Sequence, residues 1–388
     1  MQNKEGDWTL SPICRWTTDD VWEFIGEVVS GERETYSDWQ ELMRIYSDAG
    51  GTSCAVVSDA ILDGMSKKKV GKCGARTGCW VCQQAYDKSL RTMVEGDTRY
   101  HYAIGLVRFN EYLRSIRNDW SRRHWVGRTV KAGYLCVQPD TFHPAEIRRQ
   151  ARMLMQLDHD ERLRASREGE APRFEILPLE MLIAVDAFWS LNGLAKPFSI
   201  WADRKMIEEG SRFDIPDIQE VQETPIPEAR FLHVGDQWES SVWDGLRDVY
   251  REGLLEDSGC APTVGDDGLW EIETQMSFNI DPEAACMFED YEVPYLLDLY
   301  KQGVPPGGVT AGVKHYLGLG TLTVSHSQRG FFDLAMRRTA MKDRMGLTYD
   351  YKVEYLLAKS VRFADLSPEG RAAWSKKATT ASAQVDLF

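Results

Sequence analysis

The segment from residue 50 to residue 82 constrains the fold of this chain more than any other part of the sequence. It is rich in glycine, which disfavours long helices or strands and suits a backbone that wraps tightly around a centre. It also contains Cys54, Cys73, Cys79 and Cys82, of which the last three follow a C-x5-C-x2-C spacing. Because the tight turn of a C-x2-C pair directs two thiolates at one metal centre, the segment predicts a site with four thiolate ligands.

The spacing does not decide which metal this site holds. A structural zinc ion and an iron–sulfur cluster use the same four thiolates, so both stay open at this point. The four remaining cysteines stand alone and are predicted to be buried free cysteines. They are Cys14, Cys136, Cys260 and Cys286.

The bulk properties of the chain predict a soluble, cytoplasmic protein of more than one domain. It has 388 residues, and no apolar run reaches the ~18 residues of a membrane-spanning helix. The first eight residues are too polar for a secretory signal, so we expect no membrane partner. The net charge of -14 argues against nucleic-acid contact over the whole surface but leaves room for a local basic patch.

Apolar periodicity predicts a mixed fold that is mainly α-helical. A proline-broken acidic stretch after Gly210 predicts a domain boundary there. The expected units are a cysteine-containing unit over 1–95, a basic helical extension over 96–210, and an α+β domain of unknown type over 211–388. The sequence also predicts a turn that leads into a strand at 318–324. Helices are expected over residues 18–29, 39–47, 85–120, 144–168, 178–194, 238–252, 282–301, 331–345 and 351–358.

The densest basic stretch of this acidic chain lies in the predicted helical extension and is interleaved with Trp120 and Trp125. Arginine and lysine there could hold phosphates while the aromatic rings stack on exposed bases. The alternative is a solvated helix end with its tryptophans in the core. The candidate nucleic-acid-binding residues are Arg117, Arg122, Arg123, Arg128 and Lys131.

Several short motifs near the N-terminus carry a family resemblance. They are Ser11-Pro12-Ile13, Trp16-Thr17-Thr18-Asp19-Asp20-Val21-Trp22, Gly74, Gly78-Cys79-Trp80-Val81-Cys82 and Asp87-Lys88-Ser89. This set resembles the later part of the phosphoadenosine phosphosulfate reductase family, and within it the DndC-type sulfurtransferases of bacterial DNA phosphorothioation. The resemblance extends through Met93, fades towards Leu194 and is not seen beyond Gly210.

The resemblance implies both a fold and a cofactor. The N-terminal segment would be the end of an adenine-nucleotide α-hydrolase-like α/β domain. The four cysteines would hold a [4Fe-4S] cluster, which favours iron–sulfur over zinc.

The chain departs from the family at the ATP site. The family binds ATP through a Ser-Gly-Gly-x-Asp-Ser loop, which this sequence lacks, and the glycine-rich run Gly307–Lys314 does not match a phosphate-binding loop. ATP would therefore bind to a partner chain, and the protein would belong to a split or truncated enzyme or would have lost the ATPase. Ser375–Phe388 also lacks the catalytic cysteine of the sulfate reductases.

The function expected from the resemblance is the iron–sulfur component of an ATP-dependent sulfurtransferase that acts on nucleic acid. Its partners would be a PP-loop ATPase subunit, a cysteine desulfurase as sulfur donor, and DNA or RNA. No catalytic residue is assigned. The alternative is a non-catalytic nucleic-acid-binding subunit with a structural zinc or iron–sulfur site.

Overall fold

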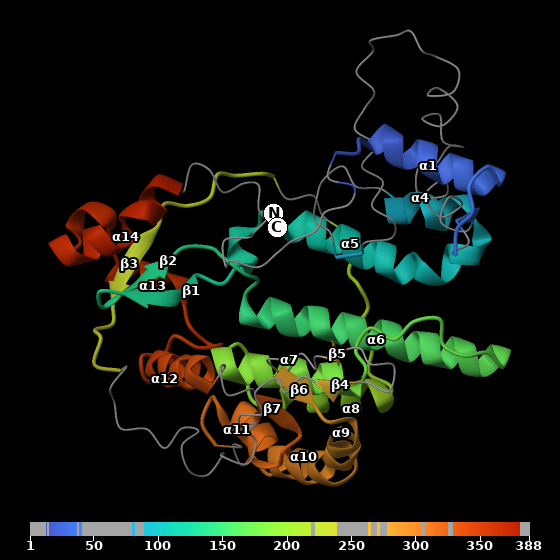
Figure 1. Ribbon diagram of the computed structural model, residues 1–388. Helices are drawn as coiled ribbons and strands as arrows, with labels where there is room; N and C mark the ends of the chain where they lie inside the picture. The colour runs from blue at the N-terminus through green and yellow to red at the C-terminus, as the bar shows by residue number, and fades with distance from the viewer. Residues whose placement is uncertain are drawn as a thin grey trace. The chain divides into compact units, whose positions relative to one another are not determined.

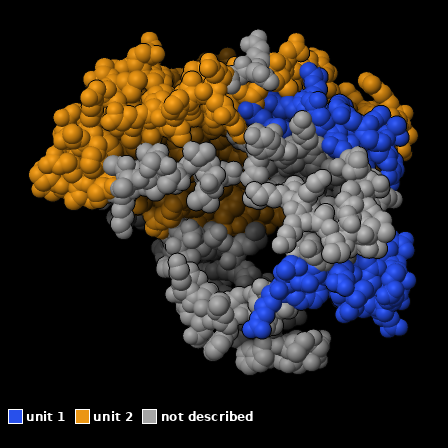
Figure 2. Space-filling view, turned by 90° about the horizontal axis from the view of Figure 1, so that it is seen from above, with its two compact units in different colours: residues 1–114 blue, residues 115–388 orange. Residues whose placement is uncertain are grey.

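The protein is mainly helical and carries small antiparallel sheets, which confirms the coarse fold prediction. Its chain divides into two compact units, Met1–Arg114 and Ser115–Phe388, which Figure 2 colours separately. In the described part of the chain, no helix is both long and apolar enough to cross a membrane. The computed structural model describes residues 13, 15–36, 39–40, 80–81, 89–218, 222–238, 263–264, 270–271, 278–303, 307–324 and 329–380.

Helix α1 (Thr18–Ser30) of the first unit has a capping residue at each end. The Thr17 hydroxyl accepts a hydrogen bond from Asp20 N at 3.2 Å, and the Asp20 carboxylate accepts one from Thr17 N at 2.6 Å. This reciprocal capping box satisfies two backbone donors that a helix start leaves free. Gly31 ends the helix with a φ of 82°. The predicted helix over 18–29 is confirmed.

The single helix predicted over 85–120 is instead three helical segments. They are α4 (Ser89–Gly96), a 3-10 helix (Thr98–Ala103) and α5 (Ile104–Ile116). The break falls at Asp97, whose side chain accepts a hydrogen bond from Arg99 N at 2.8 Å and so caps the 3-10 segment. A capping aspartate offers the backbone an alternative partner and favours a helix start over a helix interior.

Most of the described helices lie in the second unit. Two predicted helices, one over 39–47 in the first unit and one over 238–252 in the second, lie almost entirely outside the described residues, whereas the other ranges predicted in the second unit each contain helix. The described α-helices are α6 (Pro144–Glu168), α7 (Leu179–Asn192), α8 (Ser199–Glu208), α9 (Pro282–Met287), α10 (Val293–Lys301), α11 (Ala311–Gly318), α12 (Arg329–Arg344), α13 (Val353–Lys359) and α14 (Pro368–Thr380).

Helix α7 forms the centre of the largest apolar core and contacts α8, α9, α11 and α12 (Figure 1). Helices from both sides of Gly210 therefore share one core. Asp186 on α7 is fully buried and accepts hydrogen bonds from Phe198 N and from the Tyr316 hydroxyl, the latter at 2.8 Å. The Tyr316 oxygen in turn accepts from Trp201 Nε1 at 2.8 Å. This chain of polar contacts fastens α8 and α11 to α7.

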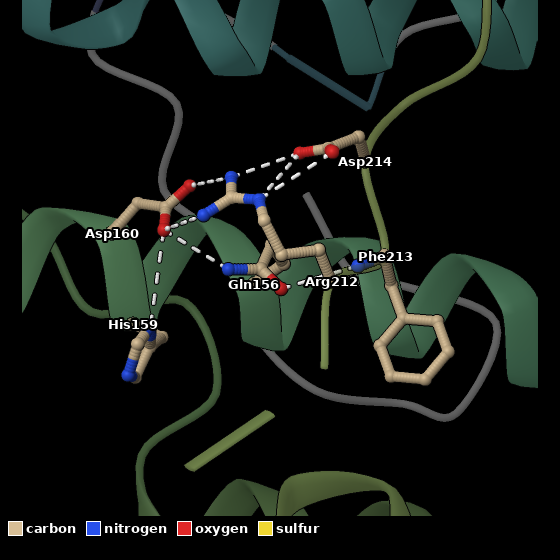
Figure 3. A network of polar contacts seen from close by, with 6 residues as sticks. All are labelled: Gln156, His159, Asp160, Arg212, Phe213 and Asp214. Carbon is tan, nitrogen blue, oxygen red and sulfur yellow. Dashed lines mark hydrogen bonds and ion pairs between the residues drawn. The ribbon is translucent and has the colours of Figure 1, made fainter. Parts of the chain in front are cut away.

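Ion pairs join α6 to the segment around α8. Asp203, which is 1% exposed, accepts from Arg148 Nε at 2.6 Å and from Arg152 Nη2 at 2.6 Å. Figure 3 shows a second, more exposed connection, in which Arg212 pairs with Asp160 and Asp214. Because exposed pairs stabilise little, the buried carboxylate is the stronger link between these elements.

A four-stranded antiparallel sheet in the order β1-β2-β3-β8 forms a second core. One face, which includes Leu135 and Leu232, packs against residues from 347 to 356. The opposite face, which includes Cys136 and Phe231, packs against Trp374 of α14. Alternate residues of β2 and β3 therefore enter different cores, as the two-residue period of a strand requires. The strands are β1 (Val126–Lys131), β2 (Tyr134–Val137), β3 (Arg230–His233) and β8 (Val361–Arg362).

Two small antiparallel pairs complete the described strands. The strand predicted within 318–324 is confirmed as β7 (Leu322–Val324), which pairs with β6 (Phe278–Ile280). The other pair joins β4 (Thr263–Val264) and β5 (Trp270–Glu271).

Candidate functional site

The predicted ligands Cys54, Cys73, Cys79 and Cys82 lie outside the described residues. The two residues inside the C-x2-C pair, Trp80 and Val81, are described and form a turn. The Trp80 ring lies 5.7 Å from that of Phe109 between centroids, and its carbonyl oxygen accepts from Asn110 Nδ2 at 3.0 Å. Helix α5 therefore fastens the middle of the C-x2-C motif.

Two of the lone cysteines are described. Cys136 is buried, as predicted, but Cys286 is exposed, so the prediction of a buried cysteine is wrong there. Cys286 lies on the short helix α9, next to Met287, which is also exposed. No group of three or more histidine, cysteine or acidic side chains within the described residues could hold a metal ion.

The first three candidate nucleic-acid-binding arginines are held by contacts within the protein. Arg117 pairs with Glu223, and Arg122 pairs with Asp119 and with Glu146 at 3.0 and 3.2 Å. The guanidinium of Arg123 donates to the Arg117 carbonyl and lies over the Phe142 ring. These contacts order the start of the second unit, so much of this positive charge is already compensated.

Trp120 and Trp125 also have structural roles. Trp125 is buried in the core beside the sheet, and Trp120 packs against that core. The Trp125 indole donates to the Trp120 carbonyl at 2.9 Å. A buried ring cannot stack on a base, so the alternative interpretation, with its tryptophans in the core, describes Trp125.

The remaining candidates, Arg128 and Lys131, lie on strand β1, so the prediction of a helix here is wrong. Val126 and Val130 favour a strand because β-branched side chains fit a pleated sheet. Ala132 and Gly133 form the two-residue turn to β2, and their φ angles of 48° and 72° are those of a type I′ hairpin. Both cations are exposed: Arg128 pairs with Asp140 at 3.1 Å, and Lys131 lies over the Trp374 ring.

Strand β1 contains a bulge between Val126 and Val130, a stretch that includes Gly127. The register of β1 against β2 shifts between Val126 and Val130, and the Gly127 carbonyl accepts from Lys342 Nζ at 2.9 Å. A Cβ at this glycine would lie 2.5 Å from the Cys136 carbonyl oxygen. Bulges bend a strand and redirect its side chains, and both Gly127 and Arg128 lie within this one.

Replacement of Gly127 by alanine is therefore expected to lower the free energy of unfolding by about 1–3 kcal/mol, because the backbone of β2 must move to admit the methyl group. Urea unfolding measures the change. Gly330→Ala on α12 is the matched control, since open space surrounds that position. Equal stability of Gly127→Ala and the wild-type protein would contradict the close approach.

Sequence reasoning missed two cations on α12, Arg338 and Lys342. They lie four residues apart and so share one face of the helix. Lys342 is 5% exposed, and its burial, together with the charges of Arg338 and Arg128, lowers its pKa to about 7. Burial and the charge of Arg128 also lower the pKa of Arg338. The i,i+4 spacing of two cations was a signal available in the sequence.

His124 lies in the same neighbourhood but is uncharged at neutral pH. Burial, with a contribution from the positive charge of Lys342, lowers its pKa to about 3. The Tyr351 hydroxyl lies 3.1 Å from His124 Nδ1 and accepts from Trp125 N at 2.8 Å. With its acceptor occupied, the hydroxyl can donate to Nδ1 of a neutral imidazole. His124 is therefore a neutral, buried residue that contacts Tyr351, and it adds no charge to the basic surface.

Comparisons with protein-family models, with curated proteins and with solved structures find no match to this chain.

Proposed function

We propose that this protein is the iron–sulfur component of an ATP-dependent sulfurtransferase that acts on nucleic acid, with the ATP-binding half supplied by a partner chain. The observation that carries the proposal is the spacing of Cys54, Cys73, Cys79 and Cys82 inside the segment that resembles the phosphoadenosine phosphosulfate reductase family. In this proposal the N-terminal segment is the end of an adenine-nucleotide α-hydrolase-like domain.

The residues around the motif fit such a centre. Four thiolates are the usual ligands of a [4Fe-4S] cluster, and the turn at Trp80 and Val81 suits a C-x2-C ligand pair. Asn110 and Phe109 of α5 hold that turn, which lies between the two proposed ligands in the sequence. A cluster with four protein thiolates has no open iron site and would supply structural or redox tuning.

Metal analysis tests the proposal directly. Protein purified without oxygen is expected to contain about four iron and four sulfide ions per chain and to absorb near ~400 nm. Cys82→Ser should lose most of the iron because one ligand of the four is removed. Cys286→Ser is the matched control, since that exposed free cysteine lies outside the proposed ligand set, and should retain the cluster.

Stoichiometric zinc in place of iron would contradict the cluster. It would favour the alternative function, a non-catalytic nucleic-acid-binding subunit with a structural metal. The exposure of Arg128 and Lys131 on the β1–β2 hairpin favours that alternative because both cations face solvent. Incubation with a PP-loop ATPase subunit, a cysteine desulfurase, labelled cysteine and ATP separates the two functions. Label in nucleic acid that depends on Cys82 supports the enzyme component, and binding without label supports the alternative.

A further inference from the structure

Three cations lie on or beside the hydrogen bond that joins α12 to the bulge of β1. Arg338 and Lys342 share one face of α12, and Lys342 reaches the carbonyl of Gly127, the residue before Arg128. The charge of Arg128 acts on both α12 cations. Residues more than 200 positions apart in the sequence thus form one positively charged cluster, which we call the bulge cluster: Arg128, Arg338 and Lys342.

The bulge cluster has an excess of positive charge. Among the described residues, Asp140 is the carboxylate that pairs with Arg128 and whose charge favours the protonated form of Lys342. Arg128 and Arg338 alone exceed this one anion by one charge, and protonated Lys342 adds a second. Like charges in a partly buried setting repel one another strongly unless an anion joins them.

Arg338 differs from several other arginines of its unit. Its neighbour Arg337 pairs with Asp333 at 2.8 Å, and Arg148 and Arg152 of the same unit share Asp203. Arg338, although partly buried, makes no hydrogen bond or ion pair with any residue that the structure describes. A desolvated guanidinium without an acceptor has five donors available for a ligand.

Arg128 also retains donors towards solvent. Its side chain is 62% exposed, and Asp140 accepts from Nε and Nη2 and so orients the guanidinium. The Nη1 group is not used in that pair. The planar fork of arginine matches the oxygens of phosphate, and two such forks can bind different oxygens of one tetrahedral anion.

We propose that Arg128 and Arg338 bind a tetrahedral oxyanion, a phosphate or sulfate group, at the surface where the β1 bulge meets α12. Lys342 supports this site indirectly, by holding the Gly127 carbonyl. The inference goes beyond the proposed function because it requires neither a metal cluster nor sulfur transfer. The oxyanion is either a phosphodiester group of a nucleic acid or a free ion, and both offer the same oxygens.

Thermal unfolding of the full chain in sodium phosphate, compared with sodium chloride at equal ionic strength, tests the site. Phosphate is expected to raise the Tm of the wild-type protein with increasing concentration, as for a ligand that binds the folded state. Arg338→Gln should weaken phosphate binding about ten- to a hundredfold, since it removes charged hydrogen bonds. Arg128→Gln should weaken it similarly.

Arg344→Gln is the matched control because Arg344 is an exposed arginine on the same helix, six residues beyond Arg338 and so on a different face. It should leave phosphate binding unchanged. Equal Tm values in phosphate and chloride, or equal losses in Arg338→Gln and Arg344→Gln, would overturn the site. Iron content is measured on the same samples, so failure of the proposed cluster is recorded separately.

A short single-stranded oligonucleotide identifies the source of the oxyanion. If the oligonucleotide binds and inorganic phosphate displaces it from the wild-type protein but not from Arg338→Gln, the site holds a phosphodiester group. If phosphate or sulfate stabilises the protein and the oligonucleotide does not compete, the site holds a free ion. Each result identifies the same two arginines as ligands.

Discussion

Replacement of Asp186 by alanine is expected to lower the free energy of unfolding by about 3–5 kcal/mol, because two buried donors would lose their acceptor. The carboxylate is fully buried and accepts from the Phe198 backbone at 3.0 and 3.1 Å as well as from Tyr316. Phe198 also has a φ of 62°, a conformation that a bulky residue rarely adopts without support. Urea unfolding at pH 7 measures the loss.

The control for this prediction is Asp350→Ala, which removes an exposed carboxylate of the same unit and should change stability by less than about 0.5 kcal/mol. A similar small effect at Asp186 would show that α8 and α11 do not depend on the buried network. The conservative variant Asp186→Asn keeps one acceptor and removes the titration.

The pH dependence of Asp186→Asn supplies a second test. Burial raises the pKa of Asp186 to about 7, above the value of 3.8 for an exposed carboxyl. Between these values the folded protein binds a proton that the unfolded chain has lost, so this group makes stability fall as pH rises from about 4 to about 7. The wild-type protein should therefore lose stability relative to Asp186→Asn across that range.

For Lys342→Met the opposite trend is expected at alkaline pH: the wild-type protein should gain stability relative to this variant as pH rises. Burial lowers the pKa of Lys342 to about 7, whereas the exposed side chain titrates near 10.5. Between these values the unfolded chain binds a proton that the folded protein does not, so the group makes wild-type stability rise with pH. The wild-type protein should gain roughly 1.4 kcal/mol per pH unit, as an upper bound, relative to Lys342→Met.

Below pH 7, Lys342 is protonated in both the folded and the unfolded protein, so the free-energy cost of burying its charge does not change with pH. There Lys342→Met should match or exceed the wild-type protein in stability, since a methionine of similar length needs no counterion. Unfolding in urea at pH 6, 8 and 9.5 measures these differences. Lys352→Met, which removes an exposed lysine, is the control and should show no such trend. A pH-independent difference at Lys342 would contradict its desolvation.

Local sequence signals predicted several elements well. Proline at the start and glycine after the end delimit α6, and its observed range, Pro144–Glu168, agrees with the predicted one. The predicted helix over 18–29 begins as expected, and Thr17 and Asp20 cap its start. These signals succeed because caps and periodicity act between residues within one or two turns.

The basic stretch is a case in which local sequence patterns predicted the wrong secondary structure. Charge and aromatic content predicted residues 117 to 131 as a candidate nucleic-acid-binding stretch of a helical extension, with a solvated helix end as the alternative, but the chain forms a short 3-10 turn and then the strand β1. Strand β2 of the hairpin also pairs with β3, which begins about 100 residues later. Pairing over such separations is not visible in a local window, because strand propensity depends on the partner surface.

The sequence by itself determined the spacing of Cys54, Cys73, Cys79 and Cys82 and the metal chemistry that such a spacing permits, since neighbouring thiolates on one short segment need no distant partner. The tertiary structure alone decided which arginines are paired and which are not. Glu223 and Glu146 compensate Arg117 and Arg122, whereas Lys342 of α12 binds the carbonyl of Gly127, the residue before Arg128. Charge compensation and desolvation depend on which side chains meet in space, and the fold sets those contacts.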